Sequence, residues 1–124
     1  MSRQDLQHGQ VAAGLALEHI VFSRERLAYS TMNDAALQRE VLGLFMAQLK
    51  ETREQLKTKL VTVQDRKFLS HNLRGAASAV GALQIEELAK SWESVNFDPL
   101  VLDALLEEAE SSFRTETSVI LHMS

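Results

Sequence analysis

The stretch "SHNLRGAASAVGA", residues 70–82, decides the fold class that we expect for this chain. It carries Gly75 and Gly81 within a segment whose apolar residues recur with helical spacing. With about 100° of rotation per residue, His71 falls about 200° from the apolar side of such a helix, so we expect its imidazole to be exposed to solvent. The opposite, buried stripe is expected to contain Leu69, Leu73, Ala76 and Val80.

The limits of this helix are marked in the sequence. Thr62 and Asp65 have the spacing of a capping box, which predicts a start near Val63. Gly81 is suited to the left-handed residue that ends many helices. We therefore expect one helix that carries His71 at its middle and stops at Gly81.

Helical periodicity continues on both sides of this segment. We expect a short helix over residues 23–32 with Ser23 as its cap, and a long amphipathic helix over residues 34–59. A further helix over residues 83–95 and a last helix that begins at Asp98 complete the pattern.

Each long helix has one apolar side, and the connections between the helices are short. The residues expected to face inward from the helices other than the one with His71 are Leu37, Val41, Phe45, Leu49, Thr52, Leu56, Leu60, Leu83, Leu88, Trp92, Leu102, Leu105, Leu106, Ala109 and Phe113. An antiparallel four-helix bundle buries all of these sides, so we expect an all-α fold. Residues 23–124 should form this bundle with a short extra N-terminal helix, and residues 1–22 an N-terminal extension.

Composition and charge restrict the partners of the chain. Its 124 residues carry a net charge of -4, so nucleic acid, which needs a basic surface, is not an expected partner. The sequence has no cysteine, no signal-peptide pattern at its start and no apolar run long enough to span a membrane. We therefore expect a single-domain cytoplasmic protein that is a monomer and has no membrane partner.

The charge is unevenly distributed along the chain. Residues 86–110 hold eight carboxylates against one lysine. The region of His71 is basic instead, because three cations lie near it in sequence: Arg66, Lys67 and Arg74.

The neighbours of His71 suit phosphoryl transfer. Arg74 follows it by three residues and Lys67 precedes it by four, which places both cations beside it on the helix surface. Gly75 lies on the exposed side one turn beyond His71, where glycine costs about 1 kcal/mol relative to alanine and leaves room for a bulky partner. A neutral imidazole can attack an acyl phosphate, and nearby cations can stabilise the moving phosphoryl group.

The segment "HNLRGAASAVGA" resembles the signature of histidine-containing phosphotransfer (HPt) domains. That signature has a histidine, an apolar residue two positions later, Lys or Arg followed by Gly, two small residues and a second glycine. The matching residues are His71, Leu73, Arg74, Gly75, Ala76, Ala77 and Gly81. The segments "NDAALQREVLGLF" and "LQIEELAKSWE" also resemble helices of that family, so the resemblance covers about residues 23–95.

The resemblance implies a four-helix bundle that relays a phosphoryl group in a multistep two-component pathway. It implies that His71 is the phosphoacceptor, that Arg74 assists it as a cation and that Gly75 provides clearance. The implied partners are receiver domains of a hybrid histidine kinase or a response regulator. No cofactor is expected on this chain, because magnesium belongs to the receiver domain. The surface around His71 that we expect to dock the receiver includes Lys67, Ser78 and Ala82.

Two other interpretations stay open. A histidine-kinase dimerisation domain also presents a histidine on a helical bundle, usually followed by an acidic residue and, a turn later, by a proline. This chain has Asn72 and Gly75 at those places and no nucleotide-binding half, so phosphorylation from ATP is not expected and its status as an enzyme is left open. The other interpretation is a helical interaction module in which His71 has no chemical role.

Other candidate sites have weaker support. The remaining histidines have no metal-ligand spacing, so no metal site is expected: His8, His19 and His122. Adjacent helical residues diverge by about 100°, so two pairs of glutamates are expected to be solvated surface charge rather than acid–base pairs: Glu86 with Glu87, and Glu107 with Glu108.

Overall fold

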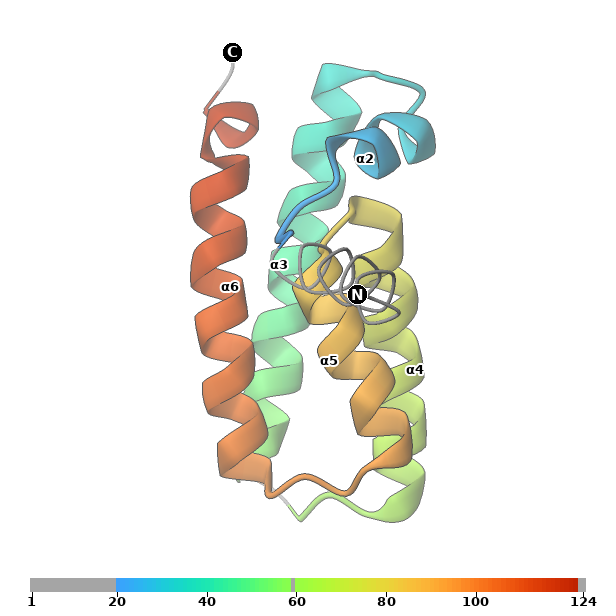
Figure 1. Cartoon of the computed structure of the whole chain (residues 1–124), viewed down its shortest axis with the longest axis vertical. Helices are drawn as coiled ribbons and strands as arrows, with labels where there is room; N and C mark the ends of the chain where they lie inside the picture. Colours follow the sequence, from blue (N-terminus) through green and yellow to red (C-terminus); the bar gives the residue numbers. More distant parts are fainter. Residues whose placement is uncertain (1–19, 59, 123–124) are drawn as a thin grey trace, which may run out of the picture.

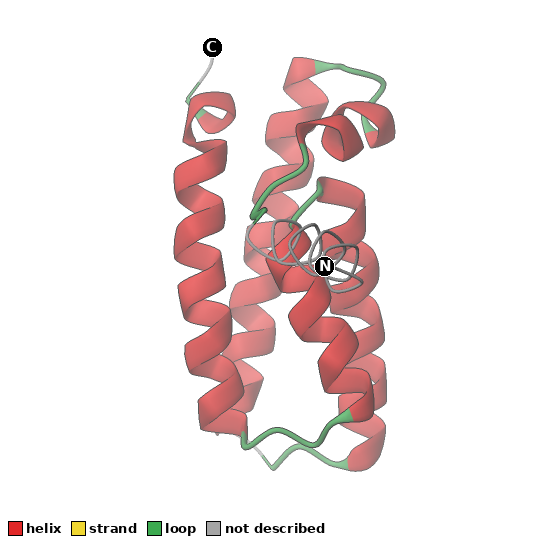
Figure 2. Cartoon of the chain, viewed as in Figure 1, coloured by secondary structure: helices red, strands yellow, loops and turns green. Residues whose placement is uncertain are grey.

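The chain folds as an antiparallel four-helix bundle with a short helix across one end (Figure 1). The computed structural model describes residues 20–58 and 60–122. Their helices are α2 (Arg24–Ser30), α3 (Ala35–Thr58), α4 (Val63–Val80), α5 (Leu83–Ser94) and α6 (Pro99–Leu121). Figure 2 shows helices joined by loops throughout these ranges, which confirms the predicted all-α bundle.

The four long helices alternate in direction (Figure 1). α4 packs closely on α5, α3 packs on both α4 and α6, and α5 packs on α6, so the four helices close around one core. α2 packs on α4 near the end where α4 stops and α5 begins. None of the described helices has the length and hydropathy of a membrane span.

Local capping signals set the starts of three helices, as predicted. Thr62 and Asp65 form a capping box in which Thr62 Oγ1 accepts from the Asp65 N–H at 3.0 Å and Asp65 Oδ2 accepts from the Thr62 N–H at 3.1 Å. Ser23 caps α2, and the Asp98 carboxylate accepts from the N–H of Leu100 at 2.9 Å at the start of α6.

The corner between α4 and α5 is fixed by the backbone. Gly81 ends α4 with φ 76°, the left-handed conformation that the sequence predicts. The chain before α2 is tied to this corner, because the Ser23 N–H donates to the Gly81 carbonyl at 2.8 Å and the Leu83 N–H donates to the Val21 carbonyl at 3.0 Å. A Cβ atom at Gly81 would collide with the Ser23 carbonyl oxygen.

The core is centred on Phe113 of α6, which is fully buried. Its ring makes edge-on contacts with Phe22 and Phe45, each with a centroid distance of 5.6 Å. Phe22 belongs to the segment that precedes α2, and it packs against the core together with Val21. Residues 1–19, the rest of the expected N-terminal extension, lie outside the described residues.

The buried side of α4 is turned relative to the prediction. Ser70 and Ala77 are fully buried, whereas Leu69 and Ala76 are only half-buried. The reason is that α4 contacts α2, α3 and α5, so its buried arc extends beyond one apolar stripe. Burial of Ser70 is inexpensive, because its hydroxyl donates to the Lys67 carbonyl at 3.4 Å within the same helix.

Several other inward-facing predictions are wrong. Leu105 is 37% exposed, and Leu60 is 87% exposed because α3 ends at Thr58. Leu37 and Leu83 are only half-buried, whereas Val41 and Leu88, also half-buried, pack against the core as expected. The fully or nearly fully buried side chains in these helices lie at neighbouring positions instead: Leu42 and Met46 in α3, and Ile85 and Ala89 in α5.

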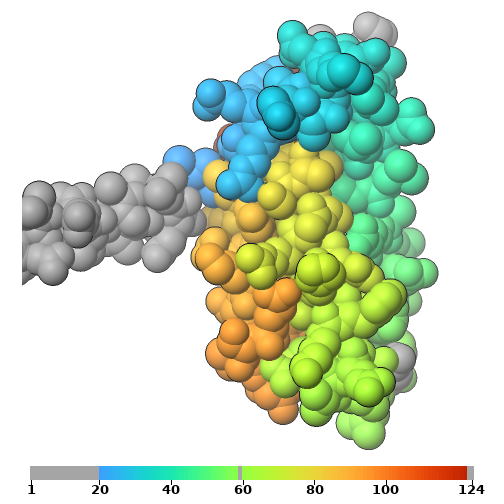
Figure 3. Space-filling view, turned by 90° about the vertical axis from the view of Figure 1, so that its right-hand side faces the viewer, coloured from blue at the N-terminus to red at the C-terminus, as the bar shows by residue number. Residues whose placement is uncertain are grey.

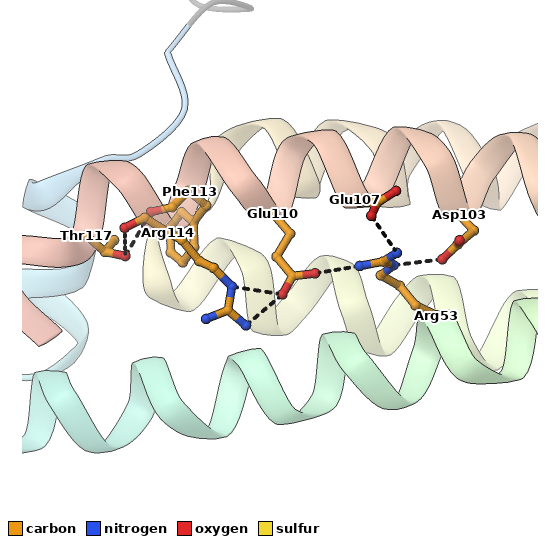
Figure 4. A network of polar contacts seen from close by, with 7 residues as sticks. All are labelled: Arg53, Asp103, Glu107, Glu110, Phe113, Arg114 and Thr117. Atoms are coloured by element: carbon orange, nitrogen blue, oxygen red, sulfur yellow. Dashed lines mark hydrogen bonds and ion pairs between the residues drawn. The ribbon is translucent and has the colours of Figure 1, made fainter.

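A polar network joins α3 to α6 (Figure 4). Arg53 donates to Asp103 at 2.7 Å and to Glu110 at 2.9 Å, and its hydrogen bond to Asp103 raises its pKa above the usual value. The three side chains are only 11–17% exposed, so they are largely removed from solvent. Arg114 donates to the second oxygen of Glu110 at 2.8 Å, while Glu107 lies 3.8 Å from Arg53 and is 70% exposed. The sequence places Arg53 on the polar side of its helix and does not reveal this network.

We expect Gly81→Ala to lower the free energy of unfolding by at least about 1 kcal/mol, because alanine is strained at positive φ and would also displace the Ser23 backbone. Gly43→Ala is the matched control, since a Cβ at Gly43 meets nothing within 4 Å in the middle of α3. This control should raise stability by up to about 1 kcal/mol. Urea denaturation measures both changes, and equal effects would contradict the role of the corner.

We expect Arg53→Met to lower the free energy of unfolding by about 1–3 kcal/mol, because it leaves the largely buried carboxylates of Asp103 and Glu110 without their shared donor. Arg114→Ala provides the comparison, since Arg114 is 56% exposed and its loss leaves Glu110 bound to Arg53. Its cost should stay below about 1 kcal/mol. Equal losses of stability in urea denaturation would show that Arg53 is not the residue that joins the two helices.

Candidate functional site

His71 projects from the middle of α4 into solvent. Its side chain is 80% exposed, as the sequence predicts, while Ser70 and Leu73 on either side of it are fully buried. The imidazole is therefore freely accessible to solvent, while the backbone of the helix that carries it is held in the bundle.

Glu93 of α5 lies next to His71. Its Oε2 atom is 3.7 Å from His71 Nδ1, and its Oε1 atom accepts from Arg74 Nη1 at 2.6 Å. A carboxylate on this side of the ring favours the proton on Nδ1 and leaves the lone pair on Nε2. In the described part of the chain, Nε2 has no hydrogen-bond partner.

The position of Glu93 follows from the corner between α4 and α5. His71 and Glu93 each lie eleven residues from Ala82, on opposite sides of it, so an antiparallel pair places them at the same height. Arg66 holds this end of α5 by donating to the carbonyls of Trp92 and Glu93 at 3.4 and 3.2 Å. Arg66 is thus engaged with the backbone and is not a free cation beside His71.

Gly75 is exposed, and a Cβ atom placed on it would meet nothing within 4 Å. Helix packing therefore does not require glycine here. A hollow of about 350 Å³ opens at this place, lined by His71, Arg74, Gly75, Ser78 and Glu86. The arrangement leaves room above the imidazole for a group carried by another molecule.

The three residues expected in the docking surface have different environments. Lys67 is exposed on the surface of α4. Ser78 is half-buried and accepts from Arg26 Nη1 at 3.2 Å. Ala82 is fully buried, because the chain turns there and its backbone pairs with Phe22, so its assignment to the docking surface is wrong. The helical projection fails at Ala82 because α4 has already ended at Val80.

The site combines an exposed nucleophile with paired charges. The cations next to the imidazole include Arg74, which is bound to Glu93, and Lys67, for which no acidic partner is found among the described residues. No group of three or more His, Cys, Asp and Glu residues is placed to hold a metal ion in residues 20–58 and 60–122. Such an arrangement suits attack by Nε2 on an electrophile that a partner presents in the hollow.

Comparison with known protein families identifies the family to which the chain belongs. A family model described as "Hpt domain" matches residues 40–115, which is more than half of the chain and includes His71. The chain belongs to the Hpt domain family. No curated protein and no solved structure matches it. Hpt domains serve histidine phosphotransfer in the phosphorelays of two-component signalling, and their partners are receiver domains.

Some residues around the imidazole of this Hpt domain are absent from the sequence-based prediction. Phe68 is 67% exposed and lies one turn before His71, on the side of α4 that the helical projection assigns to solvent. Glu93 could have been found by pairing α4 with α5 about Ala82. The expectation that Glu86 is solvated surface charge is wrong, because its side chain is only 19% exposed and is paired with Arg26. The same helix pairing could have placed it, since Ser78 and Glu86 each lie four residues from Ala82. Arg26 has no local signal, because it reaches Glu86 at 2.7 Å from a separate helix.

We expect Glu93→Gln in this Hpt domain to change the free energy of unfolding by less than about 1 kcal/mol. The Arg74–Glu93 pair is partly exposed, at 44% and 25%, and such pairs contribute little to stability. Urea denaturation and circular dichroism measure the change, with Arg53→Met as the destabilised reference. A loss as large as that of the reference would mean that the pair holds α4 and α5 together.

Proposed function

We propose that this Hpt domain is a phosphorelay intermediate in which His71 accepts a phosphoryl group from the aspartate of one receiver domain and passes it to the aspartate of another. The observation that carries the proposal is an imidazole that is 80% exposed, one turn from an exposed glycine, in a chain of the Hpt family. The chain would act as a cytoplasmic monomer without a cofactor, and the magnesium ion would belong to the receiver.

The chemistry begins at Nε2 of His71. Its lone pair attacks the phosphorus, the N–P bond forms, and the P–O bond to the receiver aspartate breaks, so the aspartate leaves as a carboxylate. The ring keeps its Nδ1 proton and gains positive charge. The Glu93 carboxylate, 3.7 Å from Nδ1, stabilises this charge, and transfer to the second receiver reverses the same steps.

Arg74 can stabilise the phosphoryl group while it stays bound to Glu93. Its guanidinium is 44% exposed and uses Nη1 for Glu93, which leaves further N–H donors for phosphoryl oxygens. Lys67 adds positive potential on the same helix surface. Both cations lie on the face of α4 that carries the imidazole, and Arg74 is held there by the same carboxylate that lies 3.7 Å from Nδ1.

The direct test is phosphoryl transfer from phosphorylated receiver domains of the source organism. Wild-type protein should acquire a label that is acid-labile and alkali-stable, as expected for a phosphohistidine, and His71→Gln should acquire none. Because His71 is exposed, the variant should keep the helix content of the wild type in circular dichroism. Transfer to His71→Gln at the wild-type rate, or no transfer from any receiver, would support an interaction module with an inert histidine instead.

We expect Gly75→Ala to separate stability from transfer. The added methyl group should raise the free energy of unfolding by up to about 1 kcal/mol, because it improves helix propensity and meets no neighbour within 4 Å. It should slow transfer to His71 at least about tenfold, because it intrudes on the space through which the receiver approaches.

Gly43→Ala is the matched control for this experiment. It has the same local effect in α3, where a Cβ also meets nothing within 4 Å, so it should raise stability without slowing transfer. An unchanged rate of transfer to Gly75→Ala would contradict the proposal that Gly75 leaves space for the receiver.

A further inference from the structure

We propose that α2 is a specificity element for the receiver domain, with Arg26 and Tyr29 as the residues that contact it. The proposal rests on phosphoryl transfer at His71, but it concerns a helix outside the part of the chain that matches the Hpt family. That match covers residues 40–115, whereas α2 spans Arg24–Ser30.

The surface next to His71 continues onto α2. The hollow at His71 shares Ser78 with a second hollow of about 570 Å³, which is lined by Glu25, Arg26, Tyr29, Ser30, Ser78 and Ala79. Figure 3 views the molecule from the side where α2 lies above α4 and α5. The two hollows therefore adjoin at Ser78, one beside the imidazole and the other beside α2.

Arg26 stands where the two hollows meet. Its Nη1 atom donates to Ser78 at 3.2 Å and to Glu86 at 2.7 Å, and its side chain is 46% exposed. The Arg26–Glu86 pair resembles the Arg74–Glu93 pair, because both place an arginine against a carboxylate of α5. The guanidinium groups of Arg26 and Arg74 are 46% and 44% exposed, so each keeps N–H donors that can bind a carboxylate on a docking protein.

Tyr29 is 89% exposed although α2 itself is firmly attached. Leu27 is buried, Ser23 caps the helix and Ser30 Oγ donates to the Ala79 carbonyl at 2.7 Å. The tyrosine is therefore an exposed aromatic side chain on a helix whose position is fixed, and it lies beside the small residue Ala79. Tyrosine and arginine are enriched among the residues that dominate binding energy in protein interfaces.

The size of a specific interface indicates what occupies these hollows. A partner that buries about 800 Å² on each side covers a patch with a radius of roughly 16 Å. Ser78 lies seven residues from His71 along α4, or about 10 Å, so a receiver centred on His71 also covers the start of the second hollow. Receiver active sites are acidic, which is complementary to Arg26 and Arg74.

The test compares receiver-dependent and receiver-independent phosphorylation of the full chain. The receiver is the one that transfers fastest to the wild type, and the small donor is phosphoramidate, which gives its phosphoryl group to imidazole and releases ammonia. Tyr29→Ala and Arg26→Ala should each raise KM for the phosphorylated receiver about fivefold or more, with kcat within about twofold of the wild type. Labelling by phosphoramidate should be unchanged, and Arg26→Lys should restore part of the loss.

Arg24→Ala is the matched control, because it removes the same charge from the same helix about 200° away from Arg26 and outside both hollows. Its KM should equal that of the wild type. Wild-type KM in both Tyr29→Ala and Arg26→Ala, with normal transfer to His71, would overturn the role of α2 and leave the relay intact. Absence of labelling of the wild type by every receiver would overturn the relay itself.

Discussion

The corner between α4 and α5 is the constraint on which the rest of the molecule depends. Gly81 turns the chain with a positive φ, and its carbonyl and the neighbouring Leu83 N–H are bound by the segment that leads into α2. This fixes the antiparallel pairing of the two helices. The pairing places Glu93 beside His71, and the same backbone contacts hold α2 over the end of α4. The corner at Gly81 thus determines the positions of the Glu93 carboxylate, the His71 imidazole and α2 relative to one another.

The two halves of the bundle carry charge in different ways. Between α3 and α6, Arg53 is bound by largely buried carboxylates, so this half is joined by polar contacts that solvent hardly reaches. Around α5 the arginines are partly exposed: Arg26 of α2 binds Glu86, Arg74 of α4 binds Glu93, and both guanidinium groups keep N–H donors for a phosphoryl group or an acidic partner. The molecule therefore combines a half joined by largely buried charges with a half whose arginines still face solvent.

The sequence predicts the helices well, because their limits depend on local chemistry. The Thr62–Asp65 capping box, the Gly81 stop and the exposure of His71 all follow from spacing within a few residues. The buried side of α4 is predicted less well, since Ser70 can be buried only because its hydroxyl is satisfied within the helix. Apolar spacing cannot show this.

The site is predicted in part for the same reason. Arg74 and Gly75 lie within one turn of His71 and are found by helical projection, which fails at Ala82 because the helix has ended. The position of Glu93 beside His71 depends on how α4 and α5 pair. Arg26 comes from α2 and lies 45 residues before His71 in the sequence. Such residues enter the site through tertiary packing, which no local pattern records.

The equal distances of His71 and Glu93 from Ala82 have a consequence for how such a chain can vary in length. A single residue inserted into α4 between His71 and Gly81 would rotate the imidazole by about 100° around the helix axis and move it by about 1.5 Å along it. The apolar side chains between the insertion and Gly81 would stay buried, whereas those before it would turn away from the core together with the ring, which would no longer lie against α5. Homologous chains of this kind can therefore exchange side chains around the histidine more freely than they can gain or lose residues between it and the corner.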